Sequence, residues 1–170
     1  MTEKRIENVI NKKLAGDARK NALDFVSFLY ANDIALDYNA DESDNWGVWC
    51  GAVGGIVGNS IGYLSITGHE NAPGPWTFWF NVSDFDGSDS ADDEFKNAMW
   101  AFASPCGRCG EGWETCMSAK KTILGKEFEN QCHSPLMFCN PDAKILENMK
   151  KFLLYLKPEI NDIQTRIKQE

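Results

Sequence analysis

Five of the six cysteines of this 170-residue chain fall in one stretch, between Ser104 and Asn140. Two of them, Cys106 and Cys109, belong to the segment Cys-Gly-Arg-Cys-Gly. A Cys-x-x-Cys turn supplies two of the four tetrahedral ligands of a zinc ion from one tight loop, and the glycines relieve crowding around the sulfurs. The spacing therefore predicts a structural metal site in a loop-rich segment.

We expect four thiolates to complete this site: Cys106, Cys109, Cys116 and Cys132. Cys132 is included because a hairpin pattern over residues 122–128 would return the chain towards the first pair. Cys139 fits better as a small buried apolar side chain, although Cys139 and His133 stay alternative ligands. The predicted ion is zinc. An iron–sulfur cluster also takes four thiolates, so the spacing leaves the identity of the metal open.

The first cysteine pair also has the Cys-Gly-x-Cys form of a thioredoxin-like active site. That chemistry needs a helix N-terminus to lower the pKa of the first thiol, and Gly110-Glu111-Gly112 is a poor helix opening. A thiol–disulfide oxidoreductase using Cys106 and Cys109 is therefore kept as an alternative function. No other catalytic motif stands out, so the sequence favours a non-enzymatic role without deciding the question.

Charge and composition restrict the class of partner. The net charge is -8 and the sequence pI is about 4.8, which disfavours binding to nucleic acid and to anionic membranes. No apolar run approaches the length of a membrane span, and the polar first ten residues do not resemble a signal peptide. We therefore expect a cytoplasmic protein, in which cysteines serve as metal ligands or redox groups rather than in disulfides.

The hydrophobic pattern predicts an α+β fold in a single domain over residues 1–170. Its elements are a helical hairpin (3–31), an antiparallel sheet of about four to five strands (46–82), a helix (91–103), the cysteine-rich metal-binding segment (104–139) and a C-terminal helix (141–156) with a short tail. Period-2 patterns and glycine turns identify the strands, and apolar stripes identify the helices. The N- and C-terminal helices are expected to pack on the sheet.

Helix boundaries follow from capping residues. Ser90, three residues before Asp93, predicts the start of the third helix. Asn140 followed by Pro141 predicts the start of the last one, and Pro158 is expected to interrupt it.

Aromatic residues form the other prominent set: Trp46, Trp49, Tyr63, Trp76 and Trp79. Aromatic side chains on neighbouring strands usually belong to the core. They could instead line a pocket for a small molecule, which makes a small-molecule-binding sensor the first alternative function.

The cysteine segment resembles one found in a group of small, functionally uncharacterised bacterial proteins. The resemblance lies in Cys106-Gly-Arg-Cys-Gly, in Lys121-Thr-Ile-Leu-Gly-Lys-Glu-Phe-Glu-Asn-Gln-Cys132, in the Asn140-Pro-Asp-Ala segment and in the aromatic Pro73-Gly-Pro-Trp segment. It implies no activity. The residues themselves lead us to expect a small cytoplasmic binding or interaction module with a structural zinc-like site, whose partner is a protein or a small molecule.

Overall fold

The computed structural model describes residues 6–38, 46–51, 60–66, 74–81, 91–105 and 119–167. It has an α+β fold with antiparallel strands, as the sequence predicts. The chain divides into two compact units, Met1–Phe78 with Phe138–Glu170 and Trp79–Met137. Each unit is described by itself below.

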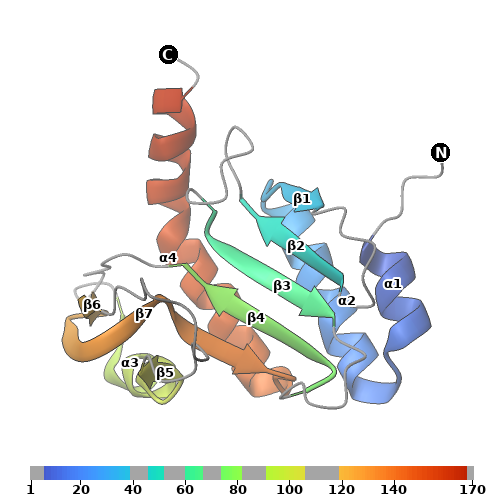
Figure 1. Cartoon of the computed structure of the whole chain (residues 1–170), viewed down its shortest axis with the longest axis horizontal. Helices are drawn as coiled ribbons and strands as arrows, with labels where there is room; N and C mark the ends of the chain where they lie inside the picture. Colours follow the sequence, from blue (N-terminus) through green and yellow to red (C-terminus); the bar gives the residue numbers. More distant parts are fainter. Residues whose placement is uncertain are drawn as a thin grey trace, which may run out of the picture. The chain divides into compact units, whose positions relative to one another are not determined.

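The first unit combines helices with an antiparallel sheet (Figure 1). Its elements are α1 (Ile6–Lys13), α2 (Gly16–Ala31), β1 (Leu36–Tyr38), β2 (Trp46–Cys50), β3 (Gly62–Ile66), most of β4 (Trp76–Phe80) and α4 (Ala143–Ile167). The strand order is β1-β2-β3-β4. The register places Val48 opposite Leu64 and Trp49 opposite Tyr63.

The core of this unit follows from the period-2 alternation of the strands. Val48, Leu64 and Phe78 are fully buried. Phe25 of α2 packs on the same face, with its ring centroid 6.0 Å from that of Trp76 and 4.9 Å from that of Phe78. Figure 1 shows α2 and α4 behind the strands, so these helices cover one face of this sheet.

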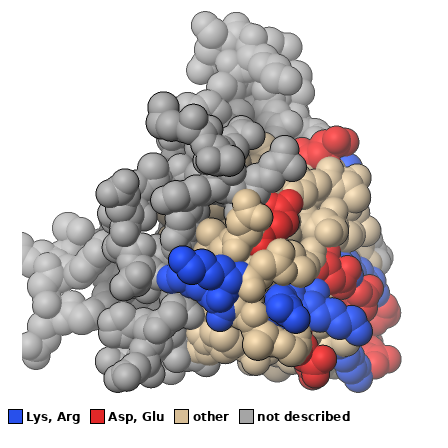
Figure 2. All heavy atoms as spheres, turned by 90° about the vertical axis from the view of Figure 1, so that its right-hand side faces the viewer, with Lys and Arg blue, Asp and Glu red and all other residues tan. Residues whose placement is uncertain are grey.

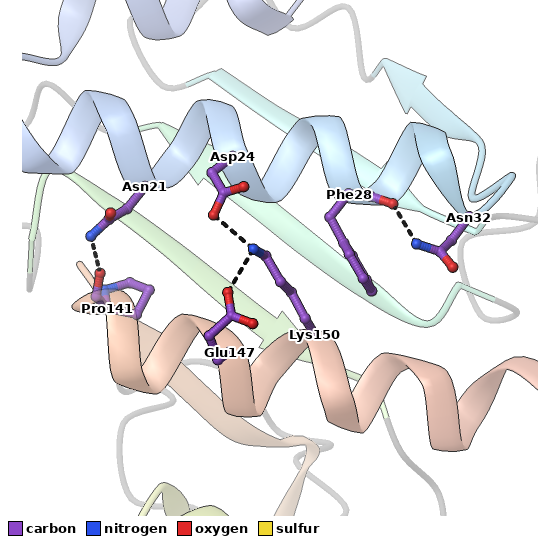
Figure 3. A network of polar contacts seen from close by, with 7 residues as sticks. All are labelled: Asn21, Asp24, Phe28, Asn32, Pro141, Glu147 and Lys150. Atoms are coloured by element: carbon purple, nitrogen blue, oxygen red, sulfur yellow. Dashed lines mark hydrogen bonds and ion pairs between the residues drawn. The ribbon is translucent and has the colours of Figure 1, made fainter.

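Polar contacts join α2 to α4 (Figure 3). The Asn21 side-chain amide donates to the Pro141 carbonyl over 3.0 Å. Lys150 Nζ lies 2.7 Å from Asp24 and 2.8 Å from Glu147, and 5.8 Å from the centre of the Phe28 ring. Partial burial lowers the pKa of Lys150, but the hydrogen bonds to the two carboxylates outweigh it, so the net pKa is raised.

The second unit contains α3 (Asp93–Trp100), β5 (Ala103–Pro105), β6 (Ala119–Ile123) and most of β7 (Lys126–Cys139). A two-residue turn joins β6 to β7, with φ of 50° at Leu124 and 78° at Gly125. Positive φ at both positions is the type I′ geometry that matches strand twist. The predicted hairpin near Gly125 is therefore confirmed. The Trp100 indole donates to the Ile123 carbonyl over 2.7 Å and fixes α3 against this hairpin.

Three predicted helix boundaries need correction. Asp92, not Ser90, caps α3, because its side chain accepts a hydrogen bond from the Phe95 N–H. Asp142, not Asn140, accepts from the Ile145 N–H at the start of α4. Asn140 instead adopts φ of 44° and donates its N–H to the Trp76 carbonyl.

The third correction concerns Pro158. The helix α4 continues through this residue to Ile167. Proline removes one hydrogen bond, that to the carbonyl four residues earlier. That carbonyl belongs to Leu154, and both Leu154 and Pro158 are exposed, so water can satisfy it. Within the predicted sheet range 46–82, residues 52–59 and 67–73 lie outside the described ranges.

Candidate functional site

The central element of the candidate site is β7, and its central residue is Gln131. Two strands pair with β7 at this residue: Pro105 of β5 and Ala119 of β6 both lie opposite Gln131. A strand residue has one neighbour on each side, so β5 and β6 flank β7. The end of β5 and the beginning of β6 are thereby fixed beside the same point of the sheet.

Irregular pairing occurs on both sides of Gln131. Between the pairs Ala103–Leu136 and Pro105–Gln131, β7 has three more residues than β5, and this excess falls on residues 132–135. Between the pairs Ala119–Gln131 and Lys121–Phe128, β7 has one more residue than β6. Asn130, with φ of 54°, lies in that bulge. Bulges bend a strand and redirect its side chains, and they are frequent next to functional sites.

This register fixes both ends of the cysteine-bearing segment 106–118. Neighbouring strands lie about 4.8 Å apart, so Pro105 and Ala119 are separated by about 10 Å across β7. Cys106 directly follows Pro105, and Cys132 directly follows Gln131. The backbone therefore places the start of the segment, its end and Cys132 close together, within the second unit.

Gln131 is itself unusual in its polar contacts. Its side chain is 2% exposed. Its amide nitrogen donates to the Glu129 carbonyl over 3.1 Å, whereas its Oε1 has no hydrogen-bond partner among the described residues. A buried acceptor left without a donor costs about 1–3 kcal/mol. The sequence gives no signal for this residue, because its burial depends on pairing with two strands from elsewhere in the chain.

Three of the four predicted metal ligands, Cys106, Cys109 and Cys116, lie outside the described residues. The backbone of Cys132 and of its neighbour His133 is described as part of β7, but their side chains are not. Within the described ranges, no group of three or more His, Cys, Asp or Glu side chains could hold a metal ion. The predicted ligand set therefore stays a prediction.

The two other cysteines have described side chains, and neither forms a disulfide. Cys50 is fully buried at the end of β2, with its sulfur 3.9 Å from the Val48 carbonyl oxygen. Burial raises the pKa of the Cys50 thiol far above its usual range, which keeps it protonated and unreactive. Cys139 is half-buried at the end of β7, in the first unit.

The predicted aromatic set divides between the core and the opposite face of the sheet. Trp76 is fully buried on the helix-covered side. On the other side, the half-buried Trp49 and Tyr63 are cross-strand partners with ring centroids 4.6 Å apart. The Tyr63 ring lies over Gly47, where an added Cβ would fall 1.6 Å from the Tyr63 hydroxyl. The indole N–H of Trp49 is buried and has no acceptor within the part of the chain that the structure describes.

The described surface shows no single charged face on the side that carries α1. Figure 2 shows basic and acidic side chains interspersed there, which is not the continuous basic patch of a nucleic-acid-binding protein. Among the described helices, none is both long and apolar enough to cross a membrane.

Comparison with protein-family models, with curated proteins and with solved structures finds no match to this chain. A functional argument therefore depends on the residues and geometry of the chain itself.

Proposed function

We propose that this protein is a small binding module whose cysteine-rich segment is folded around one structural zinc ion. The proposed ligands are Cys106, Cys109, Cys116 and Cys132. One observation supports the proposal above others: Pro105 and Ala119, which bound the segment, both pair with Gln131, the residue before Cys132. Because the ends of the segment are held about 10 Å apart, the loop is already closed, which lowers the entropy cost of bringing its thiolates to the fourth ligand.

In this proposal the ion stabilises the fold and performs no chemistry. Four thiolates close the coordination shell and leave no open position for a substrate. The segment would also provide a backbone donor for the buried Oε1 of Gln131, whose desolvation is otherwise uncompensated. A cytoplasmic location, which keeps thiols reduced, belongs to the same proposal. The ordered segment would then present a surface to a protein partner.

Elemental analysis of the purified chain tests the proposal. We expect one zinc per chain, and we expect Cys109→Ser to lose the metal together with the native fold of the segment. Cys50→Ser provides a control, because Cys50 is a buried, protonated thiol of the other unit. Metal-free protein with a reversible Cys106–Cys109 disulfide would contradict the proposal and support the oxidoreductase instead.

A second candidate function is suggested by the Trp49–Tyr63 pair. Two half-buried rings in contact suit stacking of a small planar ligand. A ligand that displaces the atoms covering the Trp49 indole N–H and brings a hydrogen-bond acceptor would also satisfy this donor, which has no acceptor among the described residues. Native mass spectrometry of the purified chain would detect such a ligand as added mass above 19.1 kDa. If the added mass persists in Trp49→Phe, which lacks the N–H, this second candidate is wrong.

A further inference from the structure

The ammonium group of Lys126 lies over two aromatic rings where α3 meets the β6–β7 hairpin. Its Nζ is 4.9 Å from the centre of the Trp100 ring and 5.1 Å from the centre of the Phe128 ring. Both distances are within the ~6 Å over which the face of a ring attracts a cation. The two rings therefore hold a cation, and that cation belongs to the chain itself.

Both rings are held by contacts that do not involve this cation. The indole N–H of Trp100 donates to the Ile123 carbonyl over 2.7 Å. Phe128 is fixed by the strand register, which places it opposite Lys121 of β6. Both rings are also half-buried. Removal of the ammonium group therefore leaves the two rings in place, so the site is preorganised for another cation.

No ion pair with a described residue holds Lys126 in this position. The neighbouring carboxylates of the hairpin, Glu127 and Glu129, both pair with Lys120 instead. The Lys126 side chain is exposed, and cation–π contacts at exposed sites are weak. Ordering a lysine side chain also costs rotamer entropy of similar size. The ammonium group therefore exchanges readily with a cation that the rings bind better.

We propose that Trp100 and Phe128 bind a quaternary ammonium group, which displaces Lys126 Nζ from the rings. A lysine ammonium is compact and strongly hydrated, so it gives up favourable hydration at a ring face. A quaternary ammonium has no N–H groups to hydrate, and it is the cation that aromatic sites characteristically recognise. The net charge of -8 also favours a cationic ligand. This site does not depend on the proposed zinc ion.

Lys126 acts in this proposal as an internal competitor. Two cation–π contacts with a partly desolvated ligand give a dissociation constant on the order of 1 mM for the empty site. If Lys126 occupies the rings about nine-tenths of the time, the apparent constant of the wild type is about tenfold higher. Lys126→Met, which retains an apolar stem without the charge, should therefore bind about ten times more tightly than the wild type.

Titration of the full chain with choline chloride tests this site. Heteronuclear NMR follows the indole N–H signal of Trp100, identified as the one missing from Trp100→Phe, with sodium chloride at equal concentrations as the salt control. The signal should shift with choline, and Phe128→Leu should abolish the shift. Lys120→Met is the matched control for Lys126→Met. It removes the same charge from the same hairpin, but that ammonium group contacts carboxylates rather than rings, so its affinity should equal that of the wild type.

The neutral alcohol in which a carbon replaces the nitrogen of choline has the same shape without the charge, so it should cause no comparable shift. A peptide with one trimethyl-lysine carries the same cation, and binding tighter than that of choline identifies a protein as its source. Equal shifts with choline and the neutral alcohol overturn the proposal. So does an absence of choline binding to Lys126→Met up to about 100 mM, or equal affinities of Lys126→Met and Lys120→Met. These comparisons decide the question even if Phe128→Leu fails to fold.

Discussion

At the scale of single residues, the missing side chain of Gly47 leaves room for the Tyr63 ring, which packs against Trp49 at an interplanar angle of 50°. A β-carbon at position 47 would fall 1.6 Å from the Tyr63 hydroxyl and 2.1 Å from the ring carbon that carries it. We therefore predict that Gly47→Ala displaces the Tyr63 ring and lowers the free energy of unfolding by about 1–3 kcal/mol, the usual cost of overpacking. Urea unfolding measures this cost.

A double-mutant cycle provides the control for this prediction. In the Tyr63→Ala background the obstructing ring is absent, so Gly47→Ala should cost much less there than in the wild type. Costs that add to within about 0.5 kcal/mol would show that the two positions do not interact. That outcome would contradict the contact between Gly47 and Tyr63.

Lys150 shows how a single charge can contribute without dominating. Its side chain is 13% exposed, but Asp24 and Glu147 are 51% and 70% exposed, so solvent screens the pairs. We predict that Lys150→Met, which retains an apolar stem near Phe28, costs at most about 1 kcal/mol at pH 7. Urea unfolding of both proteins measures the difference.

The pH dependence of this difference has a definite sign. The folded pKa of Lys150 is raised, so its stabilisation is fully present below the unfolded pKa of about 10.4. It is lost as the pH rises through the folded value. The difference in the free energy of unfolding between wild type and Lys150→Met should therefore be constant near neutral pH. It should shrink as the pH rises through the folded pKa of Lys150. A difference that widens in alkali would contradict the ion pairs of Figure 3.

At the scale of elements, the start of α3 is fixed by Asp92, whose carboxylate accepts the Phe95 N–H over 2.8 Å. We predict that Asp92→Ala destabilises the protein by about 1 kcal/mol, as the loss of an N-cap does. Asp93→Ala is the control, because the Asp93 side chain is 95% exposed and its ion pair with Lys96 is long, at 4.0 Å. It should cost less than about 0.5 kcal/mol. Equal costs in thermal unfolding would argue against Asp92 as the cap.

The sequence predicts those elements whose signals are local. The α+β class and the Leu124–Gly125 turn follow from periodicity and turn residues, and the structure has both. The choice of cap was wrong at α3 and α4 because Ser90 and Asn140 are as good candidates as Asp92 and Asp142 until the helix start is known. The strand β5 was missed because Ala103, Ser104 and Pro105 have no strand pattern and pair only because β7 lies alongside.

The candidate site is divided in the same way. Spacing alone identifies Cys106 and Cys109 as potential metal ligands. The convergence of Pro105 and Ala119 on Gln131 depends on long-range pairing, which no local pattern encodes. No local pattern predicts the burial of the Gln131 Oε1 either, since a glutamine in a polar strand is expected to be exposed.

At the scale of the whole molecule, the proposed zinc site belongs to one of the two compact units. We predict that a chelator lowers the protection of amides from hydrogen exchange in β6 and in the β7 residues up to Met137. The reason is that the free energy with which a structural ion binds contributes to the stability of the fold around it. Amides of α2, in the other unit, should lose much less protection. Hydrogen exchange with and without chelator measures both. Uniform loss over both units would contradict a local effect of the ion.

X-ray absorption at the zinc edge of the purified, reduced chain tests the central proposal most directly. A site built from Cys106, Cys109, Cys116 and Cys132 predicts four sulfur ligands at about 2.3 Å. Cys132→Ser should reduce the sulfur count, whereas Cys139→Ser should leave it at four. Protein without bound metal, or an ion with oxygen and nitrogen ligands only, would contradict the proposal that these thiolates share one ion.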